Sequence, residues 1–118
     1  NAKAEYAKSQ KPIVIKPEFG SFEVYHRDLE GRYTWGEAKE ACVKLGEGWR
    51  LPTKIELNEM YEKRDVVGGF ASNYYWSSTE SDGNYVSIQS FYTGLQLYGN
   101  TYQNYDYNVR AVRALTIK

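Results

Sequence analysis

The chain contains very little of the chemistry on which most active sites depend. Of its 118 residues, one is cysteine and one is histidine. A single cysteine, Cys42, excludes an intrachain disulfide, and its place among apolar helix positions predicts a packed thiol. One histidine and one cysteine are too few for an ordinary zinc site. No nucleophile motif accompanies His26 to form a hydrolytic triad. The sequence therefore predicts no metal, no cofactor and no catalysis.

The chain also lacks an excess of charge and a long apolar run. Lys plus Arg is 15 and Asp plus Glu is 15, so the formal net charge is zero. Without a basic patch, binding to nucleic-acid phosphates is not expected. No apolar run has the length of about 20 residues that a membrane-spanning helix needs, so no direct membrane insertion is expected. The first residue is Asn1, and we expect a processed or trimmed form in which no export signal is visible.

Two capping boxes predict two helices in the first half of the chain. Thr34 is followed three residues later by Glu37, and Thr53 by Glu56, which is the sequence pattern of a helix N-terminus. Gly46 is expected to end the first helix. A Gly-Gly pair at 68–69 predicts a loop after the second.

Short strands are expected on both sides of these helices. The expected strands are residues 12–16, 21–26, 75–80, 84–91, 95–98 and 109–117, with a hairpin turn at Thr93-Gly94. Consecutive helices followed by short antiparallel strands predict an α+β domain over residues 12–118. Residues 1–11 have no durable apolar face and are interpreted as a tail or linker.

The segment from 81 to 109 has an unusual composition. It contains no Lys, Arg, Glu, Trp, Met, Pro, Cys, His or Ala, and Tyr, Asn, Ser, Asp, Gly and Thr dominate it. These residue types are typical of adaptable binding surfaces, because Tyr gives a large contact area and Ser, Gly and Asn give flexible hydrogen bonding. The alternative is a Tyr-rich sheet that covers the core, which suits Tyr74 and Tyr75 beside Trp76 but not the later tyrosines. We predict a ligand-binding surface, and the candidate residues are Tyr85, Ser87, Ser90, Tyr92, Tyr98, Asn100, Tyr102, Asn104, Tyr105 and Tyr107.

Three stretches of the chain carry a family resemblance. They are TWGEAKEACVKLGEGWRLPTKIELNEMYEKR, YYWSSTE and VRAVRAL. Together they resemble the C-type-lectin-fold variable proteins of diversity-generating retroelements, which are related in fold to the formylglycine-generating enzyme. The resemblance covers residues 28–118. It implies two helices packed on short antiparallel strands, with a long irregular C-terminal region.

The resemblance also implies a function. In that family a reverse-transcriptase system rewrites adenines in one C-terminal segment, and the changed residues line a ligand-binding face. It implies a receptor or adhesin that recognises a macromolecule, most simply a protein, and that is exported, displayed on the cell surface or part of a phage particle. The variable region is expected at 81–108, with Trp76, Glu80, Arg110 and Arg113 in the scaffold.

A coding argument supports a rewritten segment. When both adenines of an AAC or AAT codon are mutated, the codon still ends in a pyrimidine and cannot encode Lys, Glu, Gln, Met or Trp. From 81 to 109 only Gln89, Gln96 and Gln103 depart from this rule, and they are spaced seven apart (96 − 89 = 7; 103 − 96 = 7). We expect these amides to be fixed framework groups that hydrogen-bond the scaffold.

Other functions stay open at this point. One is a calcium-independent carbohydrate-binding module, in which tyrosines stack on sugars. Another is a structural domain of a larger surface protein. A third is an enzyme of the formylglycine-generating fold, which the missing cysteine pair disfavours. Two structural expectations go with the preferred interpretation. Most of the tyrosines should open onto one face, and Trp49, Leu51, Leu57, Trp76 and Val112 should be buried.

Overall fold

The computed structural model describes residues 11–18, 20–101 and 105–115. These residues form an α+β domain with three helices and two antiparallel three-stranded sheets, as the sequence predicts for the fold class. The helices are α2 (Trp35–Lys44), α3 (Lys54–Glu62) and α4 (Arg64–Val67). The strands are β1 (Ile13–Ile15), β2 (Phe22–Val24), β3 (Tyr74–Glu80), β4 (Tyr85–Ser90), β5 (Gln96–Asn100) and β6 (Val112–Ala114). Of the expected tail, residues 1–10 lie outside the described part of the chain.

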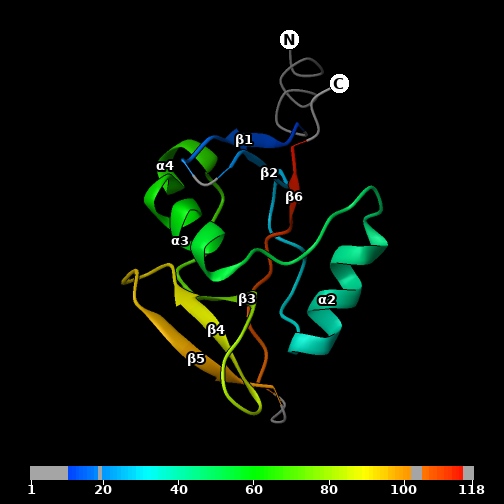
Figure 1. The fold of residues 1–118 in the computed structure, drawn as a ribbon, viewed down its shortest axis with the longest axis vertical. Helices are drawn as coiled ribbons and strands as arrows, with labels where there is room; N and C mark the ends of the chain where they lie inside the picture. Colours follow the sequence, from blue (N-terminus) through cyan, green and yellow to red (C-terminus); the bar gives the residue numbers. More distant parts are fainter. Residues whose placement is uncertain (1–10, 19, 102–104, 116–118) are drawn as a thin grey trace.

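The two sheets lie at opposite ends of the domain. One has the strand order β1-β2-β6 and the other β3-β4-β5 (Figure 1). Between them runs the C-terminal segment, which makes isolated bridges from Tyr107 to Tyr33, from Asn108 to Tyr75 and from Val112 to Arg50. Asn108 donates to the Tyr74 carbonyl and accepts from the Trp76 amide, so the C-terminal segment lies along the side of β3 that does not face β4.

Both predicted capping boxes are present. The Thr34 hydroxyl accepts from the Glu37 amide at 3.4 Å, and the Glu37 carboxylate accepts from the Thr34 amide at 3.0 Å. The reciprocal pair at Thr53 and Glu56 has distances of 3.2 and 2.9 Å. These bonds satisfy amides that have no partner within a helix, which explains why α2 and α3 begin where the sequence predicts. Gly46, at φ 78°, follows the end of α2 as expected.

Three expectations about elements are corrected. The four-residue α4 was not predicted, because no side chain caps its N-terminus. Of the expected strand at 109–117, residues 109–111 are not part of β6, because the Val109 and Ala111 carbonyls accept from the Leu29 and Tyr25 amides of a loop; residues 116 and 117 lie outside the described part of the chain. The long irregular region is partly regular, because β4 and β5 occupy most of residues 85–100.

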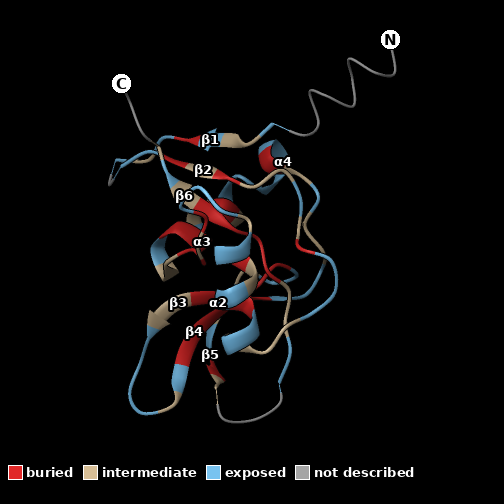
Figure 2. Cartoon of the chain, turned by 90° about the vertical axis from the view of Figure 1, so that its right-hand side faces the viewer, coloured by how far each residue is buried: buried red, intermediate tan, exposed pale blue. Residues whose placement is uncertain are grey.

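The core has two apolar clusters. One packs α2 against the second sheet through Cys42, Trp49, Leu51, Trp76 and Ile88, among others. The other packs α3 against both sheets and includes Leu57 and Val112. The five residues expected to be buried are all no more than 6% exposed, so that prediction is confirmed. Figure 2 shows that β4 is buried along most of its length.

A buried polar network locks the C-terminal segment to the rest of the domain. The Arg110 side chain is fully buried and donates from Nε to Asp28 Oδ1 at 2.8 Å. It also donates to the Gly68 carbonyl at 3.0 Å and stacks on the Phe70 ring. The Tyr75 hydroxyl donates to the other Asp28 oxygen, and burial together with this carboxylate raises the pKa of Tyr75. A buried charge needs such partners, so Arg110 is part of the scaffold.

Candidate functional site

The β4–β5 hairpin carries most of the candidate segment. Its register pairs Tyr85 with Asn100 and Gln89 with Gln96, without a bulge. The expected turn at Thr93-Gly94 is confirmed, since the Ser90 amide donates to the Leu95 carbonyl and the Gly94 amide to the Ser90 carbonyl. Gly94 has φ 86°, and a Cβ there would lie 2.6 Å from the Tyr61 ring. Only glycine fits this position without strain.

Two of the three glutamines are anchored to the scaffold as predicted. Gln89 is fully buried, and its Nε2 donates to Asn58 Oδ1 at 2.9 Å and to the Gly94 carbonyl at 3.0 Å. Gln96 Nε2 donates to the Lys54 carbonyl at 3.0 Å and to Gln89 Oε1 at 3.3 Å. These bonds hold the hairpin against the N-terminal half of α3. Gln103 lies outside the described residues.

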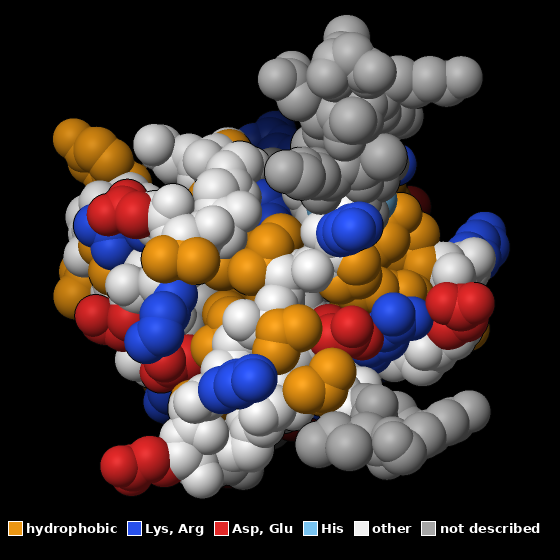
Figure 3. Space-filling model, turned by 90° about the horizontal axis from the view of Figure 1, so that it is seen from above, with side chains coloured by type: hydrophobic (Ala, Val, Ile, Leu, Met, Phe, Trp, Pro, Cys, Tyr) orange, Lys and Arg blue, Asp and Glu red, His pale blue; other side chains and the backbone are white. Residues whose placement is uncertain are grey.

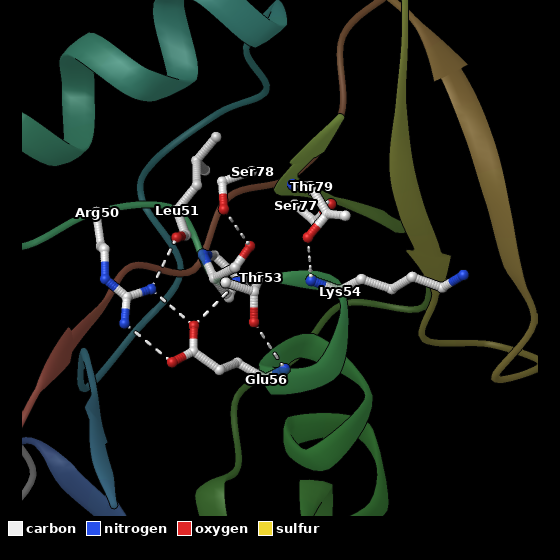
Figure 4. A network of polar contacts seen from close by, with 9 residues as sticks. Arg50, Leu51, Thr53, Lys54, Glu56, Ser77, Ser78 and Thr79 are labelled. Atoms are coloured by element: carbon white, nitrogen blue, oxygen red, sulfur yellow. Dashed lines mark hydrogen bonds and ion pairs between the residues drawn. The ribbon is translucent and has the colours of Figure 1, made fainter. Parts of the chain in front are cut away.

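The N-terminus of α3 is itself fixed to the candidate sheet. The Lys54 amide donates to Thr79 Oγ1 of β3 at 2.8 Å. Arg50 makes a two-pronged ion pair with Glu56 at 2.7 and 2.9 Å (Figure 4). Burial alone would raise the pKa of Glu56, but hydrogen bonds from Arg50 and Thr53 outweigh it and lower the pKa. The support of the hairpin is therefore a rigid, satisfied polar network.

Two candidate residues do not present their side chains to solvent. Ser87 is 2% exposed and Ser90 is 6% exposed. Ser90 Oγ accepts from the Tyr92 and Thr93 amides at 3.2 and 3.1 Å, so it stabilises the turn. Ser87 Oγ has no hydrogen-bond partner among the described residues. The expectation that Ser90 opens onto the binding face is wrong, because both faces of β4 are covered and its residues from Val86 to Ser90 are all buried.

Four candidate tyrosines are well exposed. The exposed fraction is 46% for Tyr85, 77% for Tyr92, 60% for Tyr98 and 52% for Tyr105. Tyr85 lies opposite Asn100 and Tyr98 lies opposite Ser87, so Tyr85, Tyr98 and Asn100 are neighbours on one side of the hairpin. We call these three residues the hairpin surface.

Tyr107 belongs to a different environment. Its ring packs on Trp76 at a centroid distance of 4.7 Å and on Tyr74 at 5.6 Å. Burial, with the neighbouring Tyr105 and Tyr74, raises the pKa of Tyr107. Trp76 faces the α2 cluster, on the side of the sheet opposite to Tyr98. The single face that the sequence predicts is therefore divided, because strand alternation sends the side chains to both sides of the sheet.

Tyr102 and Asn104 lie outside the described residues. Leu95 and Leu97 were expected only as strand residues, yet they are 61% and 40% exposed. The sequence gives no signal for this exposure, because it does not reveal that β5 is an edge strand.

Charged and hollow regions lie elsewhere on the domain. Lys and Arg side chains alternate with Asp and Glu on the face shown in Figure 3, which therefore has no extended patch of one sign. A hollow of about 650 Å³ lies between α2 and residues 27–33, and three basic and three acidic residues line it. In the part of the chain that the structure describes, no three His, Cys, Asp or Glu residues cluster as a metal site would require.

None of the helices in the described ranges combines the length and apolar character needed to cross a bilayer. Comparisons with models of known protein families and with curated proteins find no match to this chain.

Proposed function

We propose that this chain is a non-catalytic ligand-binding domain of the receptor or adhesin type, and that it recognises a protein. The observation that carries the proposal is the contrast within the β4–β5 hairpin. Gln89 and Gln96 are tied to α3, whereas Tyr85, Tyr92 and Tyr98 project into solvent. Large aromatic rings on a fixed backbone bind with little loss of conformational entropy.

We further propose that the fold is C-type-lectin-like and that the exposed positions of 81–108 are diversified. The two capped helices and the burial of Trp49, Leu51 and Trp76 support the scaffold part of this proposal. Buried positions such as Val86 and Ile88 limit diversification to the exposed residues, because changed core volumes destabilise the domain. A receptor or adhesin of this kind acts outside the cell, at its surface or on a phage particle.

The shape of the surface favours a protein ligand over a sugar. Tyr85, Tyr92 and Tyr98 lie on a hairpin and its turn, and none of them lines the hollow of about 650 Å³ at α2. Concave sites enclose small ligands, whereas protein interfaces use aromatic anchors on open surfaces. The hairpin surface is of the second kind.

Capture of bacterial surface proteins tests the proposal. The labelled domain should bind intact cells, and protease treatment of the cells should abolish binding while periodate oxidation of glycans leaves it intact. A variant with Tyr85, Tyr92, Tyr98 and Tyr105 all changed to Ser should lose binding. The matched control changes Val43 and Val66 to Ser, because these exposed apolar residues lie on α2 and α4. Binding that survives protease but not periodate would contradict a protein ligand.

The gene itself tests the diversification. We expect a reverse-transcriptase gene near the coding sequence and a near-copy of codons 81–108 that is rich in AAC. Mismatches between the two copies should fall on exposed positions such as Tyr98 and spare Gln89 and Gln96. If the locus holds no near-copy of codons 81–108, the proposed diversification is wrong. The binding proposal would then be tested by the capture experiment alone.

A further inference from the structure

The strand β5 lies at the edge of its sheet. It is the last strand of the order β3-β4-β5 and lies on the outer side of that sheet (Figure 1). The Ser90 amide donates to the Leu95 carbonyl and the Thr101 amide to the Asn84 carbonyl. These two bonds determine which residues of β5 hydrogen-bond to β4, because such residues alternate along an antiparallel strand. In this register Leu97 and Gly99 bond to β4, so the amide and carbonyl of Tyr98 point away from it.

No described backbone group outside the sheet bonds to this edge at Tyr98. Proteins normally protect such an edge with Lys, Pro, a bulge or a covering segment, because it accepts further strands. The β5 sequence QLYGN has no charge and no proline, and its pairing with β4 has no bulge. Leu97 and Tyr98 add exposed apolar surface at the same place. The edge of β5 therefore has the properties of a strand that pairs with a strand of another molecule.

The β5 sequence is complementary to itself. If two copies of β5 run antiparallel about a twofold axis at Tyr98, the outward amide and carbonyl of Tyr98 in each copy bond to the other. Leu97 of one copy then lies opposite Gly99 of the partner subunit, where no side chain obstructs it. Gly99 is required in the monomer as well, because a Cβ would lie 2.9 Å from the Trp76 ring. No like charges meet in this register, since β5 carries none.

We propose that two copies of this chain pair through β5 in this register and join their three-stranded sheets into one continuous six-stranded sheet (3 + 3 = 6). Side-chain alternation continues across the junction, so the two hairpin surfaces lie next to each other on one side of the joined sheet. A ligand with repeated epitopes then gains affinity from simultaneous contact with both. The pairing itself needs no ligand, so its failure is distinguishable from failure of the proposed function.

Sedimentation equilibrium of the protein alone tests the pairing. The mass should rise from monomer to dimer as concentration increases up to about 1 mM, the weak end of specific association. Tyr98→Pro removes the outward amide, which the monomer does not use, and proline is tolerated on an edge with its nitrogen facing solvent. This variant should stay monomeric, whereas Tyr98→Thr, which keeps the amide, should still dimerise. A monomeric parent throughout this range, or undiminished dimerisation of Tyr98→Pro, overturns the proposal.

A second pair of variants keeps the proposal testable if Tyr98→Pro does not fold. Leu97→Lys places a charge at the junction and should abolish dimerisation, while Leu95→Lys places the same charge in the turn outside the paired strands and should not.

Amide hydrogen exchange gives a direct readout on the parent protein. The Tyr98 amide should exchange rapidly in dilute protein and become protected in concentrated protein. Equal dimerisation of the two Lys variants, or exchange at Tyr98 that is independent of concentration, contradicts pairing through β5.

Discussion

The side-chain nitrogen of Gln89 lies 2.9 Å from Asn58 Oδ1, and this bond joins the middle strand of the candidate sheet to α3. The same nitrogen donates to the Gly94 carbonyl in the hairpin turn. Gln89 is fully buried, so its hydrogen bonds are shielded from water. One amide thus positions a helix, a strand and a turn with respect to each other.

Replacement of this amide should destabilise the domain. Gln89→Leu keeps approximate volume but leaves the Gly94 carbonyl without its side-chain donor, and it removes one of the two acceptors of the Gln96 amide, which keeps the Lys54 carbonyl. A buried polar group that loses its partner costs about 1–3 kcal/mol in the free energy of unfolding. Chemical denaturation of the two proteins measures the difference.

Asn58→Ala is the matched control for Gln89→Leu. Asn58 is exposed, so its loss removes one bond without stranding a buried group. The loss in unfolding free energy should be smaller than for Gln89→Leu. Equal losses would mean that the Asn58 contact alone carries the effect, and that the bonds to Gly94 and Gln96 contribute nothing.

The features that could be predicted from sequence are those that local chemistry determines. Capping boxes at Thr34 and Thr53 involve residues three apart, so both helix starts are readable from the chain. The framework role of Gln89 and Gln96 was predictable because their residue type departs from the surrounding composition. The buried tryptophans follow from their apolar surface.

The features that could not be predicted depend on distant partners. The Arg110–Asp28 ion pair joins residues 82 positions apart. The side of the sheet that each tyrosine occupies depends on strand register, and a shift of one residue would invert it. Composition therefore indicated a binding segment but not that Tyr98 and Tyr107 lie on opposite sides.

The exposed tyrosines should tolerate substitution without loss of stability. Tyr85→Ser and Tyr98→Ser should change the free energy of unfolding by no more than about 0.5 kcal/mol, as is usual for surface changes. Tyr107→Ser should cost clearly more, because its ring packs on Trp76. Thermal melting of the three variants tests this contrast. If Tyr98→Ser were as damaging as Tyr107→Ser, the tyrosines would be core residues and the interpretation as a binding surface would fail.

Gly94→Ala should be more damaging than Gly83→Ala. Both glycines have positive φ, so alanine at either position is strained by about 1–2 kcal/mol. Only at Gly94 would the new Cβ also collide with the Tyr61 ring; nothing lies within 4 Å at Gly83. Denaturation of the two variants should show the additional loss at Gly94.

The Tyr61 ring supplies a check on the Gly94→Ala prediction. Tyr61→Ala removes the colliding atoms, so the double variant should lose less stability than the sum of the two single losses. Strict additivity would mean that the collision is relieved by a small shift and that backbone strain accounts for the whole effect.

The ion pair between Arg50 and Glu56 should make stability depend on pH. The pKa of Glu56 in the folded protein is below the ordinary carboxyl value of 4.5. The unfolded chain therefore takes up this proton first as pH falls, and the stabilisation is lost progressively below 4.5. Glu56→Gln keeps a capping side chain but not the charge, so it should cost about 1.5–3 kcal/mol at neutral pH. The difference between the parent and this variant should shrink as pH falls below 4.5.

Denaturation at a series of pH values measures this difference directly. Glu62→Gln is the control, because it removes an exposed carboxylate near the end of the same helix, away from Arg50. Its effect at neutral pH should be small, since exposed charges contribute little to stability. A difference between the parent and Glu56→Gln that stays constant from neutral to acid pH would contradict the prediction, because it would show that the carboxylate of Glu56 is not preferentially ionised in the folded protein.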